Sequence, residues 1–246
     1  MLLSVPLCLR FVALASPAQI DRLKVLACLA MLIDHVNSAL LGGAYLWPAL
    51  VGRAALPVFV VAFAENLTLS PDRLQRSASR LWVASLLAQP AFVLAFNGPW
   101  WGANILVLFA VVAQALRWGL DGGTTHRVSA GLLLAVGSLV LSTTYGAAGV
   151  AFALSSVVLL HPYRFAHSRA AVAVWWVSLL ALNPAHPLFA VAGAVGLMVL
   201  LWMSGKGLSG WAGRFVPPRA FLAFYVGHLA ALAALVVFEL REIAAL

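Results

Sequence analysis

The sequence predicts an all-α, polytopic membrane protein with about nine transmembrane helices, and three observations support this fold class. Of the 246 residues, 64% are hydrophobic and only 9% are charged, whereas a soluble domain carries about 25% charged residues. Long apolar runs follow one another along the whole chain. Lys and Arg fall almost entirely in alternate connections between these runs. Lipid is therefore the expected solvent, and too little chain remains for a separate soluble domain.

The predicted helices are apolar runs that end at Gly, Pro or charged residues. A helix needs about 20 residues to cross the hydrocarbon core. Several of the runs are shorter, so tilted or partial spans are compatible with the pattern. No internal repeat divides the chain. In order, the predicted spans are 23–41, 46–66, 80–97, 102–118, 127–142, 145–161, 169–183, 187–204 and 220–240.

Residues 1–19 precede the first predicted span. The sequence Ala-Leu-Ala-Ser at 13–16 is typical of a signal-peptide cleavage site, but no basic residue precedes the apolar run and Arg10 interrupts it. We therefore expect an uncleaved interfacial segment at 1–19, followed by a single transmembrane domain at 20–246.

The basic residues give the predicted bundle a direction across the membrane. Arg53 lies inside a span, and Arg241 alone is assigned to the outer side. Since basic connections stay in the cytoplasm, the N-terminus is predicted to be cytoplasmic and the C-terminus periplasmic, which favours an odd number of helices. The net charge of +8 is then a topology signal and not a sign of nucleic-acid binding. The residues assigned to the cytoplasmic side are Arg10, Arg22, Lys24, Arg73, Arg76, Arg80, Arg117, Arg127, Arg164, Arg169, Lys206, Arg214 and Arg219.

Neither a metal site nor a disulfide is predicted. Cys8 and Cys28 lie in apolar surroundings on the predicted cytoplasmic half, where we expect them in the core or at the interface. The chain has no CxxC or HExxH motif. Four histidines in or next to loops are expected to be solvated: His126, His161, His167 and His186.

Four ionisable residues lie deep inside predicted spans, where they are costly and by default mark a functional site. Asp34 and His35 are in the first span, Arg53 is in the second and His228 is in the last. At about 1.5 Å per residue, three of them fall within about 5 Å of the middle of their helices. We therefore expect one polar layer around a wet cavity.

Asp34 and His35 point about 100° apart on a helix, so they do not form a simple dyad. Asp34 is expected to pair with Arg53 or to orient a residue from another helix. Structural readings stay open, with Asp34 and Arg53 as a structural ion pair and His228 as a packing residue.

Lys24 lies eleven residues, or about three turns, before His35 and shares its helix face. This face offers a cation at the cytoplasmic edge and a base near the middle, although Lys24 can equally be a snorkelling anchor. Three basic residues of the next cytoplasmic connection either join this mouth or serve topology alone. They are Arg73, Arg76 and Arg80.

Polar residues also gather at the outer ends of three spans. Asn104, Tyr145 and Asn183 occupy these positions. We expect them to line the outer part of the cavity, although each can also be a helix cap or an interhelical hydrogen bond.

Several of these residues occur in segments by which the sequence resembles the TraX family, the conjugative-pilus pilin acetylases. The segments run from about residue 16 to about residue 235 in the family's order, and the buried Asp-His and Gly-Arg segments are the strongest. The chain is also similar, more distantly, to transmembrane acyltransferases of the acyltransferase-3 type, in which an Arg precedes a His by ten intervening residues. Lys24 stands in the place of that Arg. The matching segments are Leu32-Ile33-Asp34-His35, Gly52–Phe59, Asn66-Leu67, Arg80-Leu81-Trp82, Gly102–Leu106, Gln114, Thr143–Gly146 with Gly149, Leu182-Asn183, Phe224-Tyr225 and His228.

The resemblance implies a bacterial inner-membrane enzyme that transfers an acetyl group from acetyl-CoA to the N-terminal amine of a processed pilin subunit. His35 is then expected to be the general base, Arg53 or Tyr145 to stabilise the oxyanion, and Asp34 to hold Arg53. The residues expected to bind the donor phosphates are Lys24, Arg73, Arg76 and Arg80. The residues expected to contact the acceptor are Asn104, Asn183 and His228. Leu56 stands where family members often have Phe, and Glu65 precedes Asn66, departures that concern substrate shape more than chemistry.

Alternatives remain open at this stage. Transfer can be direct or can pass through an acetyl-His35 intermediate. The acceptor can instead be an envelope glycan or a small amine. A proton-coupled transporter would use Asp34, His35 and Arg53 as a relay, but the sequence predicts no repeats and no pair of discontinuous helices. The sequence leaves the oligomeric state open.

Overall fold

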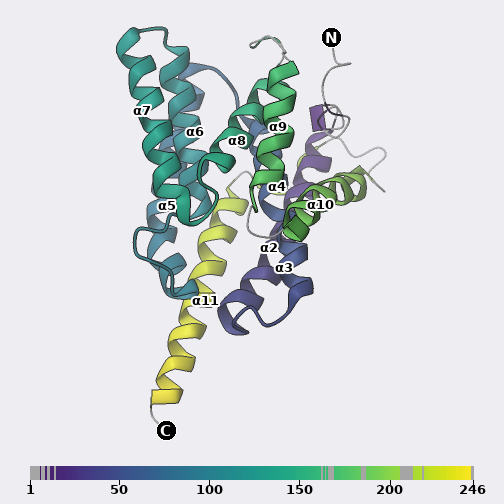
Figure 1. The fold of residues 1–246 in the computed structure, drawn as a ribbon, viewed down its shortest axis with the longest axis vertical. Helices are drawn as coiled ribbons and strands as arrows, with labels where there is room; N and C mark the ends of the chain where they lie inside the picture. Colours follow the sequence, from purple (N-terminus) through teal and green to yellow (C-terminus); the bar gives the residue numbers. More distant parts are fainter. Residues whose placement is uncertain are drawn as a thin grey trace. The chain divides into compact units, whose positions relative to one another are not determined.

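The structure is a computed structural model and describes residues 6, 9, 12, 13, 15–161, 163, 165, 169–183, 187–205, 213–217 and 219–244. These residues form helices and no strand (Figure 1). In chain order the elements are α2 (Pro17–Leu40), α3 (Leu46–Gly52), α4 (Ala55–Asn66), α5 (Pro71–Phe96), α6 (Ile105–Leu120), α7 (Thr124–Val140), the 3-10 turn η2 (Leu141–Thr143), α8 (Gly146–Leu160), α9 (Arg169–Ala181), α10 (Pro187–Gly205) and α11 (Ala220–Ala244).

Six helical segments of the described chain are long and apolar enough to cross a membrane. Three shorter apolar helices, α6, α8 and α9, accompany them. The chain is therefore a helical membrane protein, as its composition predicted. The crossing of all nine predicted segments and the orientation of the termini stay predictions. The six spanning segments are Pro17–Leu40, Leu46–Asn66, Pro71–Phe96, Thr124–Thr143, Pro187–Gly205 and Ala220–Glu239.

Two predicted helix starts were wrong. α2 begins at Pro17, six residues before the predicted start, so it includes part of the expected interfacial segment. α5 begins at Pro71, where a start at 80 was predicted. Proline at the first helical position and Asp72 in the first turn both favour a helix N-terminus. Three arginines that were assigned to a connection therefore lie on α5 itself. They are Arg73, Arg76 and Arg80.

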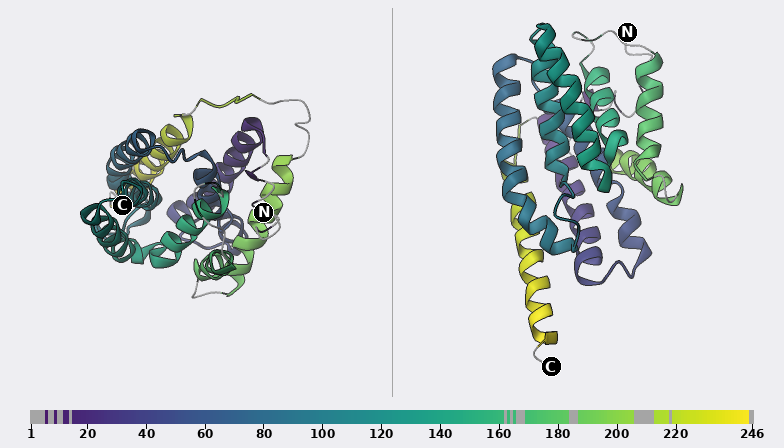
Figure 2. Two further views of the ribbon diagram at one scale, coloured as in Figure 1. Left: turned by 90° about the horizontal axis from the view of Figure 1, so that it is seen from above. Right: turned by 60° about the vertical axis from the view of Figure 1, so that its left-hand side comes forward.

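The chain forms two compact units, which are described separately. Unit 1 comprises Met1–Asp34, Trp47–Leu67 and Ala148–Pro217, and here α10 packs against α4 and α9. Unit 2 comprises His35–Leu46, Thr68–Ala147 and Pro218–Leu246. In unit 2, α5 lies beside α6 and α11, and α6 lies beside α7 (Figure 2). α2 is one continuous helix that contributes to both units, and the division falls between Asp34 and His35.

The second predicted span has the expected limits, but it is not one continuous helix. α3 ends at Gly52, and the chain turns at Arg53 and Ala54 before α4 begins. Pro57 explains the break, because it has no N–H to bond the carbonyl of Arg53 four residues earlier. Within the turn, the Ala54 N–H donates to the carbonyl of Val51, three residues earlier, at 3.2 Å. The predicted span at 46–66 is thus confirmed in its limits, and the turn within it was not predicted.

Glycines on α10 allow close packing against this break. A Cβ on Gly193 would lie 3.2 Å from the Arg53 carbonyl oxygen, and a Cβ on Gly196 would overlap the Cβ of Ala54. Small residues at helix interfaces let backbones approach one another in membrane proteins. The helix break at Arg53 and Ala54 therefore packs closely against α10 within unit 1.

We expect Gly196→Ala to lower the thermal unfolding temperature. Overpacking a tight contact costs about 1–3 kcal/mol. Gly131→Ala on α7 is the matched control, because nothing lies within 4 Å of its added Cβ, and alanine favours a helix interior by about 0.5–1 kcal/mol over glycine. Unfolding in detergent micelles, followed by tryptophan fluorescence, measures both variants. An unfolding temperature of Gly196→Ala at or above that of the unsubstituted protein would contradict the packing described.

Candidate functional site

The centre of the candidate site is a pair of histidines from the first and last helices of the described chain. Nδ1 of His35 on α2 lies 2.9 Å from Nε2 of His228 on α11. The two rings are stacked, with centroids 5.1 Å apart and planes 19° apart. Nδ1 of His228 lies 3.0 Å from the carbonyl oxygen of Phe224, one helical turn earlier. Both residues belong to unit 2, so the pair is an interaction within one compact unit.

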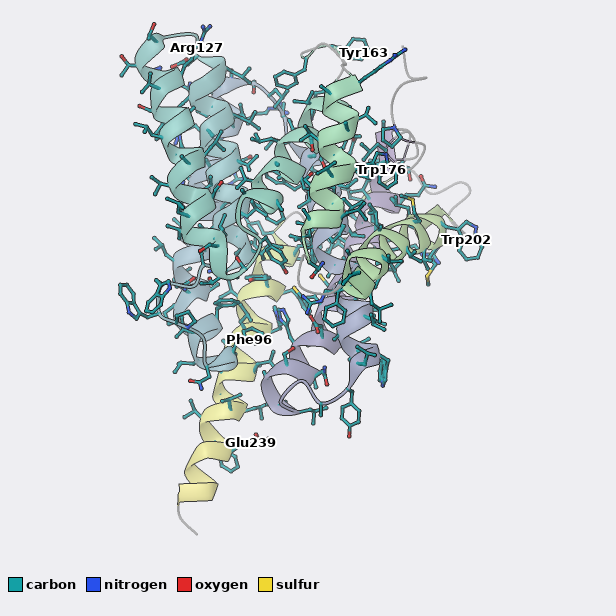
Figure 3. The ribbon with its side chains drawn as sticks, viewed as in Figure 1. Phe96, Arg127, Tyr163, Trp176, Trp202 and Glu239 are labelled. Carbon is teal, nitrogen blue, oxygen red and sulfur yellow. The ribbon has the colours of Figure 1, made fainter. Side chains whose placement is uncertain are left out.

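Aromatic rings hold the two imidazoles in place. Phe96, at the end of α5 (Figure 3), meets the His35 ring edge-on with centroids 4.8 Å apart. The Phe224 ring stacks on His228, with planes 11° apart, and Tyr225 meets His228 edge-on with centroids 5.4 Å apart. His228 is 8% exposed. Each imidazole is therefore restrained by at least one ring besides its histidine partner.

Tyr145, a predicted catalytic residue, belongs to the same unit and is linked to this pair through Tyr225. It interacts electrostatically with Tyr225, which contacts His228. The buried Tyr225 hydroxyl also interacts with the backbone N–H of Ile105, at the start of α6. The structure thus brings the predicted residues His35 and His228 together, and Tyr145 interacts with their neighbour Tyr225.

Asp34 and Arg53, the other two predicted catalytic residues, lie together in unit 1. Gly52 packs directly on the Asp34 side chain, because a Cβ at that glycine would overlap Asp34. Arg53 is near enough to Asp34 for their charges to interact. Its guanidinium also lies over the ring of Phe189, with 4.6 Å between Cζ and the ring centroid. Oδ1 of Asp34 and Nε of Arg53 are buried and have no hydrogen-bond partner among the described residues.

Asn104 has the cap and interhelical contacts that were one of its two expected roles. It is fully buried at the N-cap of α6, and its Oδ1 accepts from the Leu106 N–H at 3.0 Å. Its Nδ2 donates to the Ser85 carbonyl and to Gln89 Oε1 on α5, at 2.9 and 2.8 Å. Asn183, two residues after the end of α9, is half-buried and belongs to unit 1. Contact of either residue with an acceptor stays a prediction.

Lys24 lies in a charged cluster that the sequence did not predict. Asp21, three residues earlier on α2, is fully buried, and Oδ1 lies 3.7 Å from Nη1 of Arg214. Arg214 also donates to Oδ1 of Asn66 at 2.6 Å. Lys24 interacts electrostatically with both Asp21 and Arg214. All four residues belong to unit 1, where two cations share one buried carboxylate.

Asp21 also fixes the chain that carries Arg214. Its Oδ2 accepts hydrogen bonds from the backbone N–H groups of Phe215 and Val216, each at 3.2 Å. An acid one turn before a lysine, at the start of a span, was the available signal. The sequence does not show that this acid contacts Arg214, because the two residues are far apart along the chain.

The other residues predicted to bind the acetyl donor belong to unit 2, whereas Lys24 belongs to unit 1. They are Arg73, Arg76 and Arg80, all exposed. Their spacing of three and four residues places them on one face of α5, while the buried Leu74, Ala78 and Leu81 form the opposite face. Unit 2 thus has a basic stripe at the start of α5, and unit 1 has the Lys24–Arg214 cluster.

Two further expectations were tested by the described residues. His161 is half-buried, with Nε2 2.9 Å from the Ala64 carbonyl near the end of α4, so its expected solvation was wrong. Carbonyls in a last helical turn have no partner within the helix, which explains the contact. Cys28 is buried and free, as expected. Several residues with sequence-based assignments lie outside the described residues: Cys8, Arg10, Arg164, His167, His186 and Lys206.

The fold and the site together define a polytopic helical membrane protein with paired titratable residues inside its apolar helices. A model of the family described as TraX protein matches residues 19–236. The chain is 36% identical over 228 residues to Protein TraX of Escherichia coli and 35% identical over 229 residues to Protein TraX of Escherichia coli strain K12. Each alignment covers 89% of this chain and 88% of the relative. The chain belongs to the TraX family, as the sequence resemblance predicted. No solved structure matches it.

We expect Asn104→Ala to lower the thermal unfolding temperature substantially. The change removes an N-cap, worth about 1 kcal/mol, and two side-chain hydrogen bonds to α5, worth about 0.5–1.5 kcal/mol each. Gln75→Ala is the control, since Gln75 is exposed and donates only to the Ser79 hydroxyl, at 3.4 Å. If both variants unfold at the same temperature, the Asn104 network does not hold α6 to α5.

Proposed function

We propose that this protein is a membrane acetyltransferase that transfers an acetyl group from acetyl-CoA to the N-terminal amine of a pilin subunit, in bacterial conjugation. The observation that carries the proposal is the hydrogen bonding of the two ring nitrogens of His35. One ring nitrogen is bonded to His228, and the other, Nε2, has no hydrogen-bond partner among the described residues. A restrained imidazole with an unused nitrogen is suited to accept a proton from a substrate. Membership of the TraX family supports the choice of substrates.

The chemistry requires a base because the acceptor is an α-amine. Its pKa is near 8, so at neutral pH most of it is protonated and cannot attack a thioester. The ammonium first loses one proton to solvent, and His35 Nε2 takes a second proton from the neutral amine as it attacks the thioester carbonyl. The same proton then leaves with the departing thiolate, so His35 returns to its neutral form. The Tyr145 hydroxyl, in the unit that contains His35, is proposed to donate to the oxyanion of the tetrahedral intermediate.

Asp34 and Arg53 are proposed to supply charge from unit 1. Their unpaired buried atoms retain hydrogen-bonding capacity, and Arg53 is a second candidate for the oxyanion. The Gly52 contact and the neighbouring helix break restrain them in unit 1.

The donor phosphates are proposed to bind the Lys24–Arg214 cluster. Both side chains are cations that a phosphate would bridge, and Asp21 holds the backbone that directly follows Arg214. Lys24 lies about 16 Å before His35 along α2, at about 1.5 Å per residue. The pantetheine arm of a coenzyme A thioester would follow this face. The stripe at Arg73, Arg76 and Arg80 is a second proposed contact for the donor.

The orientation completes the proposal. With the N-terminus cytoplasmic and nine spans, Lys24 faces the cytoplasm, where acetyl-CoA is found. The pilin amine would then enter from the periplasmic side of the inner membrane. The basic residues of the connections support this direction.

We expect His35→Gln to abolish acetylation of the pilin N-terminus. Loss of a general base costs about 10²–10⁴ in rate. Mass spectrometry of pilin from cells that carry the variant measures the acetylated fraction. His126→Gln is the matched control, since His126 is half exposed and pairs only with Asp121, at 2.8 Å. Full acetylation with His35→Gln, in a variant that inserts and folds normally, would exclude the proposed base.

We expect Lys24→Gln and Arg214→Gln each to weaken acetyl-CoA binding about tenfold, because each removes one charge-assisted contact to phosphate, worth about 1.5–3 kcal/mol. The increase in unfolding temperature with acetyl-CoA concentration reports the affinity. Arg127→Gln serves as the control, because Arg127 is exposed at the start of α7. Equal stabilisation of all three variants would place the phosphates elsewhere, for example on the α5 stripe.

A proton-coupled transporter is the competing function, and one observation favours it. The helix break at Arg53 resembles the discontinuous helices of transporters, which the sequence did not predict. Transporters of that kind use such helices in pairs from two related halves, and the sequence has no internal repeat. Stabilisation by acetyl-CoA distinguishes the two functions, because a transporter has no differential affinity for it. A different acceptor, such as an envelope glycan or a small amine, would leave that stabilisation intact but abolish pilin acetylation.

A further inference from the structure

A chain of hydrogen bonds leads from a backbone carbonyl through both histidines. The Phe224 carbonyl oxygen lies 3.0 Å from His228 Nδ1, and His228 Nε2 lies 2.9 Å from His35 Nδ1. A carbonyl oxygen can only accept, whereas each nitrogen of a neutral imidazole is either the donor or the acceptor. The carbonyl at one end therefore determines where each proton lies along the chain.

The assignment follows in two steps. His228 Nδ1 must carry the hydrogen, since its partner is the Phe224 carbonyl. Neutral His228 then has its lone pair on Nε2, so His35 must donate from Nδ1. Neutral His35 consequently has its lone pair on Nε2, the nitrogen without a partner among the described residues. The opposite tautomers would place two lone pairs or two hydrogens against one another.

We propose that His228 is a positioning residue that fixes His35 in the Nδ1–H tautomer and so makes Nε2 the basic nitrogen. The inference rests on the proposed function only where it makes Nε2 the base for acetyl transfer, and the tautomer itself does not depend on that function. A histidine without this partner distributes its proton between both nitrogens and lacks a fixed base. When Nε2 takes the proton of the acceptor amine, the Nδ1–H remains bonded to His228, so only one proton moves.

The same contacts give His228 a role different from the substrate contact that the sequence suggested. Both of its ring nitrogens are engaged inside the protein. Its ring is held between Phe224 and Tyr225, at centroid distances of 5.1 and 5.4 Å. Phe96 in turn restrains His35. Contact with a substrate would require His228 to give up one of these hydrogen bonds.

The tautomer itself is the most direct test. We would label the full-length protein with ¹⁵N-histidine in lipid bilayers and assign the His35 signals by their loss in His35→Gln. Nitrogen chemical shifts distinguish a protonated from an unprotonated ring nitrogen. We expect a protonated Nδ1 and an unprotonated Nε2 for His35. A His35 protonated at Nε2 alone, or an equal mixture of both forms, would overturn the inference. This readout needs no acetyl transfer, so it stands even if the proposed function fails.

Two substitutions of His228 separate positioning from packing. The amide oxygen of His228→Gln can accept from His35 Nδ1 at the position of Nε2, whereas His228→Leu fills space without accepting. We expect His228→Gln to keep the His35 tautomer and to lower kcat less than tenfold. His228→Leu should mix the tautomers and lower kcat on the order of 10² with KM little changed. Equal kcat in the two variants would overturn a positioning role. Absence of acetyl transfer in the unsubstituted protein would instead refute the proposed function.

Discussion

Polar groups inside apolar helices must find their partners within the protein, and this constraint organises the structure. In hydrocarbon an unsatisfied polar group costs several kcal/mol, of the order of a protein's whole stability. His35 meets the constraint by pairing with His228, which joins α2 to α11 across 193 residues of sequence. Asn104 meets it through α5. The contacts that make the candidate site are therefore also contacts that hold unit 2 together.

Much of the fold could be predicted from the sequence because hydropathy reports how long each apolar run is. Every predicted span overlaps a helix of the described chain. Hydropathy does not report a helix that continues beyond its apolar run into polar residues, so the start of α5 at Pro71 was missed. Nor does it report a missing N–H, so the break caused by Pro57 was missed although the proline is visible in the sequence.

The sequence gives the depth of each polar residue along its helix, and the site could be predicted only to that extent. Depth placed His35 and His228 in one layer, but it carries no information on which faces meet, and the direct contact between their rings was not predicted. Asp34 and Arg53 were expected together, and the structure brings them into one unit beside Gly52. Asp21 and Arg214 were missed as a pair, because their contact joins residues that are far apart in the sequence and lie near span ends.

Reconstitution would show whether this protein acetylates the N-terminal amine of a pilin, as we propose. The purified protein in liposomes would receive acetyl-CoA and a peptide with a pilin N-terminus, and mass spectrometry would locate the added acetyl group. We expect acetylation of the α-amine alone, dependent on both the protein and acetyl-CoA. A folded protein that leaves the α-amine free, or that acetylates lysine side chains of the peptide equally well, would contradict it.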